Sequence, residues 1–155
     1  VNDEFNVLTA LESEIFNEAI AANKQNFVLV RGEKLLKLSV AYMDDHPSDS
    51  LLERVYEMAA LGAESCGKYN DAINYLYLAQ RNFPKSKRAP IYLFNRARIL
   101  DDVLNKKDES ILAYNELVEL YPDDSLSISM KAYLNSTLMN KSEAELLEFF
   151  NSKNQ

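Results

Sequence analysis

The stretch LLERVYEMAALGAESCGKYNDAINYLYLAQRNFP, residues 51–84, decides the fold class of this chain. In its first part, apolar residues recur at positions 51, 52, 55, 56, 58, 59 and 61, the wide apolar stripe of a helix that packs on two sides. The pattern breaks at residues 67–70, and a second apolar face follows at Ala72, Ile73, Leu76, Ala79 and Phe83. These residues predict two helices joined by a tight turn.

Three short segments punctuate the chain at nearly constant intervals. Residues 45–49, 82–86 and 120–124 each place an aromatic ring before a proline and a small polar residue shortly after it. The prolines, Pro47, Pro84 and Pro122, are 37 and 38 residues apart. Each segment is predicted to end a helix, because proline disfavours helical geometry in the residue before it and lacks an amide hydrogen. The side chains expected to cap the following helices are Ser48, Ser50, Ser86, Asp124 and Ser125.

The central unit resembles the tetratricopeptide repeat (TPR), a family pattern of about 34 residues that folds as a helix–turn–helix. Counted from Glu53, the matching residues are Tyr56, Ala60, Gly67 at the turn, Tyr69, Ala72, Leu76, Ala79 and the terminating Pro84. Ala59 and Ala63 depart from the pattern, since the family usually has larger residues there. The departures predict a thinner helix pair of the same kind.

The resemblance extends over most of residues 1–155 as about four helix pairs in one domain, with approximate bounds 4–47, 51–84, 88–122 and 125–151. It implies an all-α, right-handed superhelical solenoid of antiparallel helix pairs. In the third pair, placing Ala97 at the small position requires one extra residue in the loop 101–110. The first helix of the chain is expected to run from about Asp3 to Asn26, and Ser142–Glu145 resembles a capping box that opens the last helix.

Composition excludes several function classes. The formal net charge of -7 repels nucleic-acid phosphates, and no apolar run approaches the roughly 18 residues of a membrane-spanning helix. One histidine and one cysteine cannot build a paired His or Cys metal site, and no nucleophile elbow or phosphate loop is present. We therefore expect no enzyme activity, no cofactor, no metal and no nucleic-acid partner.

Four local features have a chemical and a structural interpretation. Residues 44–46, Asp-Asp-His, are either a metal site or a solvated helix end, and the latter is favoured. The carboxylate pairs 101–102 and 123–124 are expected to be surface caps unless a dry cleft shifts a pKa. Cys66 is expected to be a small helix residue and not a redox sensor. Phe149 and Phe150 either cap the stack or dock a partner.

The resemblance also assigns an interaction surface, because in this family the first helix of each pair lines a concave groove. In the second unit the groove residues would be Arg54, Glu57, Met58, Leu61, Glu64 and Ser65, and in the third Phe94, Asn95, Arg98, Asp101 and Asp102. The mixture of apolar residues with both signs of charge suits an extended peptide or a helix. The family's basic clamp for acidic chaperone tails is not reproduced, since Glu57 and Leu61 occupy positions where it needs basic and amide residues.

Repeats of 37 to 38 residues that end in an aromatic residue and proline also resemble those of bacterial envelope TPR proteins, such as the repeat lipoprotein of the β-barrel assembly machinery and the Tol-Pal accessory protein. This likeness implies a protein-binding scaffold in an envelope complex, in the periplasm or tethered to the outer membrane, while the cytoplasm remains open. Because the sequence begins at Val1, we expect a preceding signal, lipid anchor or tag. The alternative is a self-associating spacer that forms a homo-oligomer through its first helix or through the Phe149–Phe150 helix.

Overall fold

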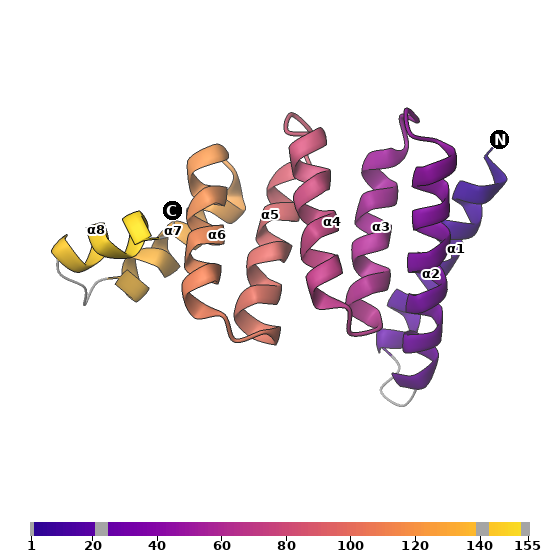
Figure 1. Cartoon of the computed structure of the whole chain (residues 1–155), viewed down its shortest axis with the longest axis horizontal. Helices are drawn as coiled ribbons and strands as arrows, with labels where there is room; N and C mark the ends of the chain where they lie inside the picture. The colour runs from indigo at the N-terminus through magenta and orange to yellow at the C-terminus, as the bar shows by residue number, and fades with distance from the viewer. Residues whose placement is uncertain (1, 21–24, 139–142, 153–155) are drawn as a thin grey trace. The chain divides into compact units, whose positions relative to one another are not determined.

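The computed structural model describes residues 2–20, 25–138 and 143–152. In these ranges the chain forms eight α-helices, one π-helical turn and no strand (Figure 1). The elements are α1 (Asp3–Ile20), α2 (Gln25–Asp45), α3 (Leu52–Ser65), α4 (Tyr69–Asn82), α5 (Ala89–Arg98), the π-helical turn η1 (Ile99–Val103), α6 (Lys107–Leu120), α7 (Ser125–Leu138) and α8 (Glu143–Ser152). The all-α prediction is confirmed.

The predicted helix boundaries fail at the N-terminal end of the chain. Helix α1 ends at Ile20 and Gln25 already belongs to α2, so the single helix expected from Asp3 to Asn26 is wrong at its far end. The sequence between these two helices, within residues 18–26, contains neither proline nor glycine, the two residues that interrupt helices most strongly. Ser142 of the expected capping box lies outside the described residues.

By their internal contacts, residues 1–92 and 93–155 form two compact units, and the boundary between them falls within α5. In the first unit, α1 packs on α2, α2 on α3 and α3 on α4, and α1 also contacts α3. Figure 1 shows α2, α3 and α4 side by side. A core cluster joins the first three helices through Leu8, Leu11, Ile15, Leu35, Tyr42, Leu52, Val55 and Met58. Burying each large apolar side chain of this kind contributes roughly 1.5–3 kcal/mol.

Two glycines allow α2 and α3 to approach closely. A Cβ atom on Gly62 of α3 would lie 2.7 Å from the backbone nitrogen of Leu36 and 2.8 Å from the carbonyl oxygen of Gly32, both in α2. A Cβ atom on Gly32 would lie 2.9 Å from the carbonyl oxygen of Gly62. Both contacts are shorter than real Cβ atoms show, and therefore both crossing positions require glycine.

The three proline turns repeat one geometry. The amides of His46, Phe83 and Tyr121 each close the last turn of the preceding helix, at N···O distances of 2.9, 3.0 and 3.0 Å. Three residues after each of them, the amides of Asp49, Ser86 and Asp124 bond back to the carbonyl of the aromatic residue at 3.2, 3.1 and 3.2 Å.

The side chains in these turns also repeat. Asp49, Ser86 and Asp124 each accept a hydrogen bond from the amide two residues on, at 2.8, 3.1 and 2.9 Å, as short polar side chains do in Asx and Ser turns. Ser86 and Asp124 are predicted capping residues. In the first turn Asp49 bonds the amide of Leu51, the residue before α3, and no side chain caps α3, so the predicted caps Ser48 and Ser50 are wrong.

The turns inside the second and third helix pairs are also alike. Gly67 and Asn105 both have positive φ, 78° and 53°, which lets the backbone leave one helix and enter the next. The following amides, of Lys68 and Lys106, bond back to Ala63 and Leu100, both at 2.8 Å. The Lys106 bond spans one residue more, and so the third pair holds an extra residue before Asn105.

That extra residue falls within the predicted stretch 101–110, but its first part belongs to the π-helical turn η1 and is not a loop. Buried residues of α5 and η1 follow those of α3 at an interval of 37, as Val55 and Tyr92 or Ala63 and Leu100 show, whereas Gly67 and Asn105 are 38 apart. The amide of Leu104 bonds to the carbonyl of Ile99, five residues back, at 3.0 Å. The extra residue therefore lies between Leu100 and Asn105, within the predicted stretch, but the expected loop is wrong there, because a π-turn absorbs one residue inside the helix end.

In the second unit, α6 packs on α7 and on η1. Aromatic rings link the helices, with centroids 6.0 Å apart for Phe94 and Tyr114 and 5.6 Å apart for Tyr114 and Tyr133. Ser110 of α6 is fully buried, and its hydroxyl donates to the carbonyl of Lys107 at 2.7 Å. This buried polar side chain is therefore satisfied within α6.

Candidate functional site

Four of the predicted groove residues form one face of α3. Arg54, Glu57, Leu61 and Glu64 follow each other at helical spacing, and all four are partly exposed. We call these four residues the α3 face. Ser65 is also partly exposed, and its hydroxyl donates to the carbonyl of Leu61 at 2.7 Å.

Met58 does not lie on this surface, so its prediction is wrong. Its side chain is fully buried in the core cluster with Leu8, Leu11 and Ile15 of α1. The reason is that α1 contacts α3 and covers the side of α3 on which Met58 stands. Leu61 also packs against the core cluster while remaining partly exposed.

Ion pairs fix the charges of the α3 face. The guanidinium of Arg54 binds both carboxylate oxygens of Glu12 in α1, at 2.9 and 3.1 Å, and also pairs with Glu57. Glu57 in turn accepts hydrogen bonds from Arg88, one of them from Nε at 3.0 Å. Along the series Glu12, Arg54, Glu57 and Arg88 the charges alternate in sign. A network of this kind holds its side chains in place better than an isolated surface ion pair does.

The electrostatics of the network favour fixed charges. Burial opposes the charged form of Arg54, but Glu57 and Glu12 outweigh it and raise the pKa of the guanidinium. Hydrogen bonds to Glu57 raise the pKa of Arg88. Burial, the charge of Glu57 and a 2.8 Å hydrogen bond to Glu53 raise the pKa of Tyr92. These arginines stay charged and Tyr92 stays protonated near neutral pH.

Glu12 and Arg88 belong to this site, although the sequence reasoning did not place them there. Glu12 is 42 residues from Arg54, and Arg88 is 31 residues from Glu57. A partial signal existed, because Arg88 directly precedes the third helix pair and so lies near the end of a first helix.

The groove residues predicted for the third helix pair, which lie in the compact unit 93–155, have different surroundings. Phe94, Asn95 and Arg98 are partly exposed, with the ring of Phe94 against Tyr114 and the Arg98 Nε donating to Asn95 at 3.5 Å. Asp102 is exposed. Asp101 is instead held by Lys107, at 3.1 Å, and by the hydroxyl of Tyr133, at 3.0 Å.

Asp101 therefore acts as a structural anchor of the π-turn. Its two oxygens tie η1 to the start of α6 and to α7, and Lys107 also contacts the Tyr133 hydroxyl. Hydrogen bonds to Tyr133 and then to Asp101 raise the pKa of Lys107. Burial, followed by the charges of Asp101 and Asp102, raises the pKa of Tyr114 to about 12.

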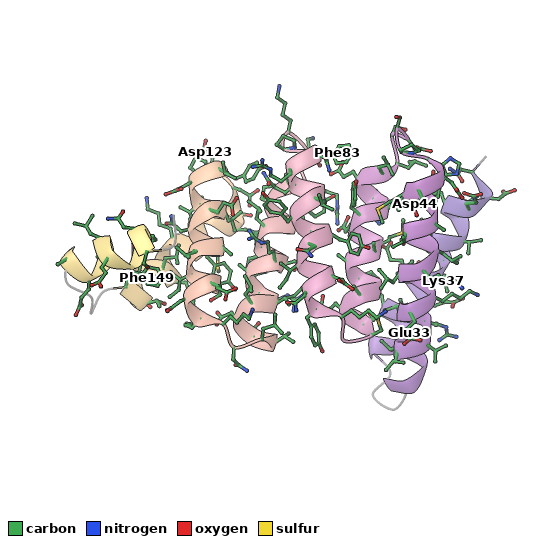
Figure 2. All side chains as sticks on the ribbon, viewed as in Figure 1. Glu33, Lys37, Asp44, Phe83, Asp123 and Phe149 are labelled. Carbon is green, nitrogen blue, oxygen red and sulfur yellow. The ribbon has the colours of Figure 1, made fainter. Side chains whose placement is uncertain are left out.

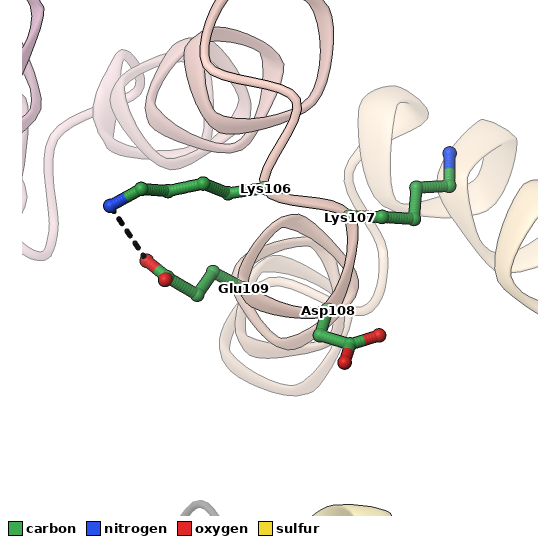
Figure 3. Close-up of a pocket in the computed structure, with 4 residues that line it drawn as sticks. All are labelled: Lys106, Lys107, Asp108 and Glu109. Atoms are coloured by element: carbon green, nitrogen blue, oxygen red, sulfur yellow. Dashed lines mark ion pairs between the residues drawn. The ribbon is translucent and has the colours of Figure 1, made fainter.

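Hollows on the surface of the described residues include the following two. The first, of about 350 Å³, lies at the start of α6 and is lined by Lys106, Lys107, Asp108 and Glu109 (Figure 3). Lys106 pairs with Glu109 at 3.7 Å, and Lys107 turns away from them (Figure 3). All four residues are exposed, so this is an open, solvated helix start.

The second hollow, of about 240 Å³, is apolar and lies between α1 and α2. Val7 and Leu8 line it from α1, and Leu38, Ala41 and Tyr42 line it from α2. Glu4 from α1 and Asp45 from α2 complete its lining and are its acidic residues. The sequence analysis did not identify this surface.

The remaining candidates for chemistry have ordinary partners. His46 contacts Glu4 at 2.8 Å and stacks near the ring of Tyr42. Cys66 is half-buried, and its thiol lies 3.5 Å from the carbonyl of Ala63. Phe149 and Phe150 pack edge to face at 5.2 Å within α8.

Across the described ranges, no three His, Cys, Asp or Glu side chains gather as a metal-binding group. Among the helices in those ranges, none is both long enough and apolar enough to cross a membrane. The chain matches no protein-family model, no curated protein and no solved structure.

Proposed function

We propose that this chain is a TPR-like scaffold that binds a peptide segment or a partner protein along the first helices of its helix pairs. The observation that carries the proposal is the recurrence of one turn, with the same three hydrogen bonds, after α2, α4 and α6. Helix pairs joined by such repeated turns stack on their neighbours and produce extended surfaces. In this proposal the pairs continue as a right-handed superhelical solenoid.

The α3 face supports binding through its composition. Arg54 and Glu57 present opposite charges in fixed positions, and Leu61 adds partly exposed apolar area beside Glu64. Binding would cost the side chains of this face little conformational entropy, because the ion pairs already hold them in place. Such a surface suits a peptide that carries both apolar and charged residues.

In the third helix pair, four residues support the same proposal: Phe94, Asn95, Arg98 and Asp102. These residues combine one aromatic ring, one amide and both charge signs at partly or fully exposed positions. Aromatic and arginine side chains are the types most enriched at the energetic centres of protein interfaces. Asp101 is left out of the proposed binding set, because Lys107 and Tyr133 hold its carboxylate.

Site-specific photo-crosslinking tests the proposal in cells that make this protein. A photoreactive residue is placed at Glu64 or Asp102 on the first-helix faces, and at exposed Asn74 of α4 as the matched control. We expect one protein adduct shared by the first two positions and absent from the control. Equal labelling from Asn74 would contradict binding through the first helices.

Charge reversal gives a second test, with a control for folding. Arg98→Glu is expected to weaken partner binding about tenfold while leaving the melting temperature within a few degrees, because Arg98 is only half-buried. Leu61→Glu separates the two effects poorly, since Leu61 packs against the core cluster. A loss of folding in Arg98→Glu that parallels the loss of binding would count against the proposal.

We further propose a bacterial envelope compartment, on the resemblance of the 37- and 38-residue repeats alone. Fractionation of the native cells with an antibody against the chain tests this. Recovery with the periplasmic or outer-membrane fraction is expected, and recovery only with the cytosol would reject it.

A further inference from the structure

The α1–α2 pair has an apolar side that stays open in the part of the chain that the structure describes. The floor of the hollow on this side is made of Leu8 and Tyr42, which are almost fully buried, and Val7 beside them is 47% exposed. The opposite side of α2 faces α3, where Gly32 and Gly62 bring the two backbones together. The pair is therefore packed on one side, and none of the described residues covers the other.

The lining residues have the spacing of a groove between two helices. On α1, Glu4, Val7 and Leu8 stand three and one residues apart, which puts them on one face of the helix. On α2, Leu38, Ala41, Tyr42 and Asp45 form a second row at spacings of three, one and three residues. Small, exposed Ala41 leaves room between the rows, and a ridge of side chains from a third helix fits such a groove.

The margin of the hollow is negatively charged. The side chain of Glu4 is 62% exposed, and Asp45 is exposed in the last turn of α2, which contains no basic residue. The C-terminal end of a helix also carries a partial negative charge, so Asp45 adds to the local potential instead of cancelling it. His46 pairs with one oxygen of Glu4, at 2.8 Å. A partner that carries basic residues beside its apolar stripe complements this margin.

A second copy of this chain is a poorer occupant. The exposed apolar residue of α8, Leu147, is flanked by Glu145 and Glu148, which would meet the carboxylates of the hollow. The formal net charge of -7 adds to the repulsion between copies. The charge pattern therefore favours a different protein.

We propose that the α1–α2 hollow is a docking site for an amphipathic helix of a partner protein, with apolar residues in the hollow and basic residues toward Glu4 and Asp45. This site is distinct from the α3 face, and it does not depend on binding there. It would let one scaffold hold two partners at once.

Three labelled peptides of about 18 residues test the site with the full chain, by fluorescence anisotropy. The first has a leucine stripe flanked by lysines, the second replaces the lysines with glutamates, and the third scrambles the first. We expect the lysine peptide to bind at least about tenfold more tightly than either of the others. Equal binding of the glutamate peptide would overturn the proposal.

Variants with reversed charges at the hollow test where on the chain the lysine peptide binds. The double variant Glu4→Lys with Asp45→Lys should weaken the lysine peptide about tenfold and improve binding of the glutamate peptide. Its matched control is Glu33→Lys with Asp44→Lys, which changes the net charge equally. Figure 2 shows Glu33, Lys37 and Asp44 along one side of α2, and none of them lines the hollow. The control should stay within about twofold of the parent chain, and an equal loss in it would reduce the effect to net charge and overturn the site.

A bulky substitution tests whether the lysine peptide binds in the hollow or on another surface. Ala41→Arg fills the space between the two rows from an exposed position, so the fold should persist, as a melting curve checks. It should abolish binding of the lysine peptide, and unchanged affinity would show that the peptide binds elsewhere. If light scattering shows that the parent chain dimerises and Ala41→Arg prevents it, a second copy covers the hollow and the proposal is wrong.

Discussion

At the scale of single residues, Gly62 lies where the backbones of α2 and α3 approach closely. A methyl group there would meet backbone atoms of Leu36 and Gly32, which cannot rotate away as a side chain does. We expect Gly62→Ala to lower the free energy of unfolding by about 1–3 kcal/mol, because α2 and α3 must separate. Urea denaturation followed by circular dichroism measures this.

Gly67 supplies the matched control for that substitution. It has a positive φ of 78°, but an added Cβ would meet nothing within 4 Å. Asn105 occupies the equivalent turn of the next pair with φ of 53°, so Gly67→Asn should cost less than about 1 kcal/mol. Equal losses at Gly62 and Gly67 would show that backbone conformation matters more than the α2–α3 contact.

Asp49 gives the first proline turn a dependence on pH. The amide of Leu51 and then the hydroxyl of Tyr42 donate to its carboxylate and lower its pKa from the ordinary value of 3.8. A group with a lowered folded-state pKa stabilises the fold above its ordinary pKa, and this contribution is lost as pH falls through the folded value. We therefore expect Asp49→Ala to destabilise the chain at neutral pH and to flatten the acid side of its stability profile.

Urea denaturation at a series of pH values from about 7 to about 2 measures this profile. Asp123→Ala serves as the control, because Asp123 is an exposed carboxylate in the third proline turn. Its profile should run parallel to that of the parent chain. If the Asp49→Ala profile also runs parallel, the two hydrogen bonds do not discriminate between the charged and neutral carboxyl.

At the scale of elements, η1 is a place where one residue can be removed. The π-turn holds the residue by which the third pair exceeds the second, so deletion of exposed Asp102 should restore an α-helical end and keep the chain folded. Deletion of Glu64 from the regular end of α3 should instead rotate the chain that follows and unfold the second pair. Circular dichroism and thermal melting of both variants distinguish these outcomes. Equal damage from both deletions would show that Asp101 and its partners require the π-turn.

Helix ends could be predicted from the sequence where a nearby proline or glycine marks them. Three aromatic-proline segments and Gly67 marked helix ends, since the backbone preferences of proline and glycine act over a few residues. The break between α1 and α2 and the π-turn were missed. Neither has such a marker, because a π-turn differs from an α-helix only in which carbonyl each amide reaches.

The candidate site was predictable only in part, for a related reason. The TPR resemblance, anchored in one unit, assigned Arg54, Glu57, Leu61 and Glu64 to a common surface, and the structure places all four on one face of α3. Spacing could not show that α1 buries Met58, nor that Glu12 and Arg88 supply the charges around Arg54 and Glu57. These features come from contacts between helices that are far apart in sequence.

At the scale of the whole molecule, the division into two compact units predicts that a destabilising substitution in one unit affects that unit more than the other. Ala72 of α4 is fully buried, and α4 packs on α3, so Ala72→Glu forces a carboxylate into a close helix contact. An uncompensated buried charge costs about 3–5 kcal/mol. In a repeat protein each pair depends on its neighbours, and damage should therefore weaken with distance along the chain.

Hydrogen exchange resolved along the chain tests this last expectation. In Ala72→Glu, amides of α3 and α4 should lose most of their protection, while those of α6 and α7 in the second unit should lose less. Asn74→Glu adds the same charge to the exposed side of α4 and should change neither region. If both units lose protection equally in Ala72→Glu, the chain unfolds as one cooperative body, and the division at Tyr92 has no energetic meaning.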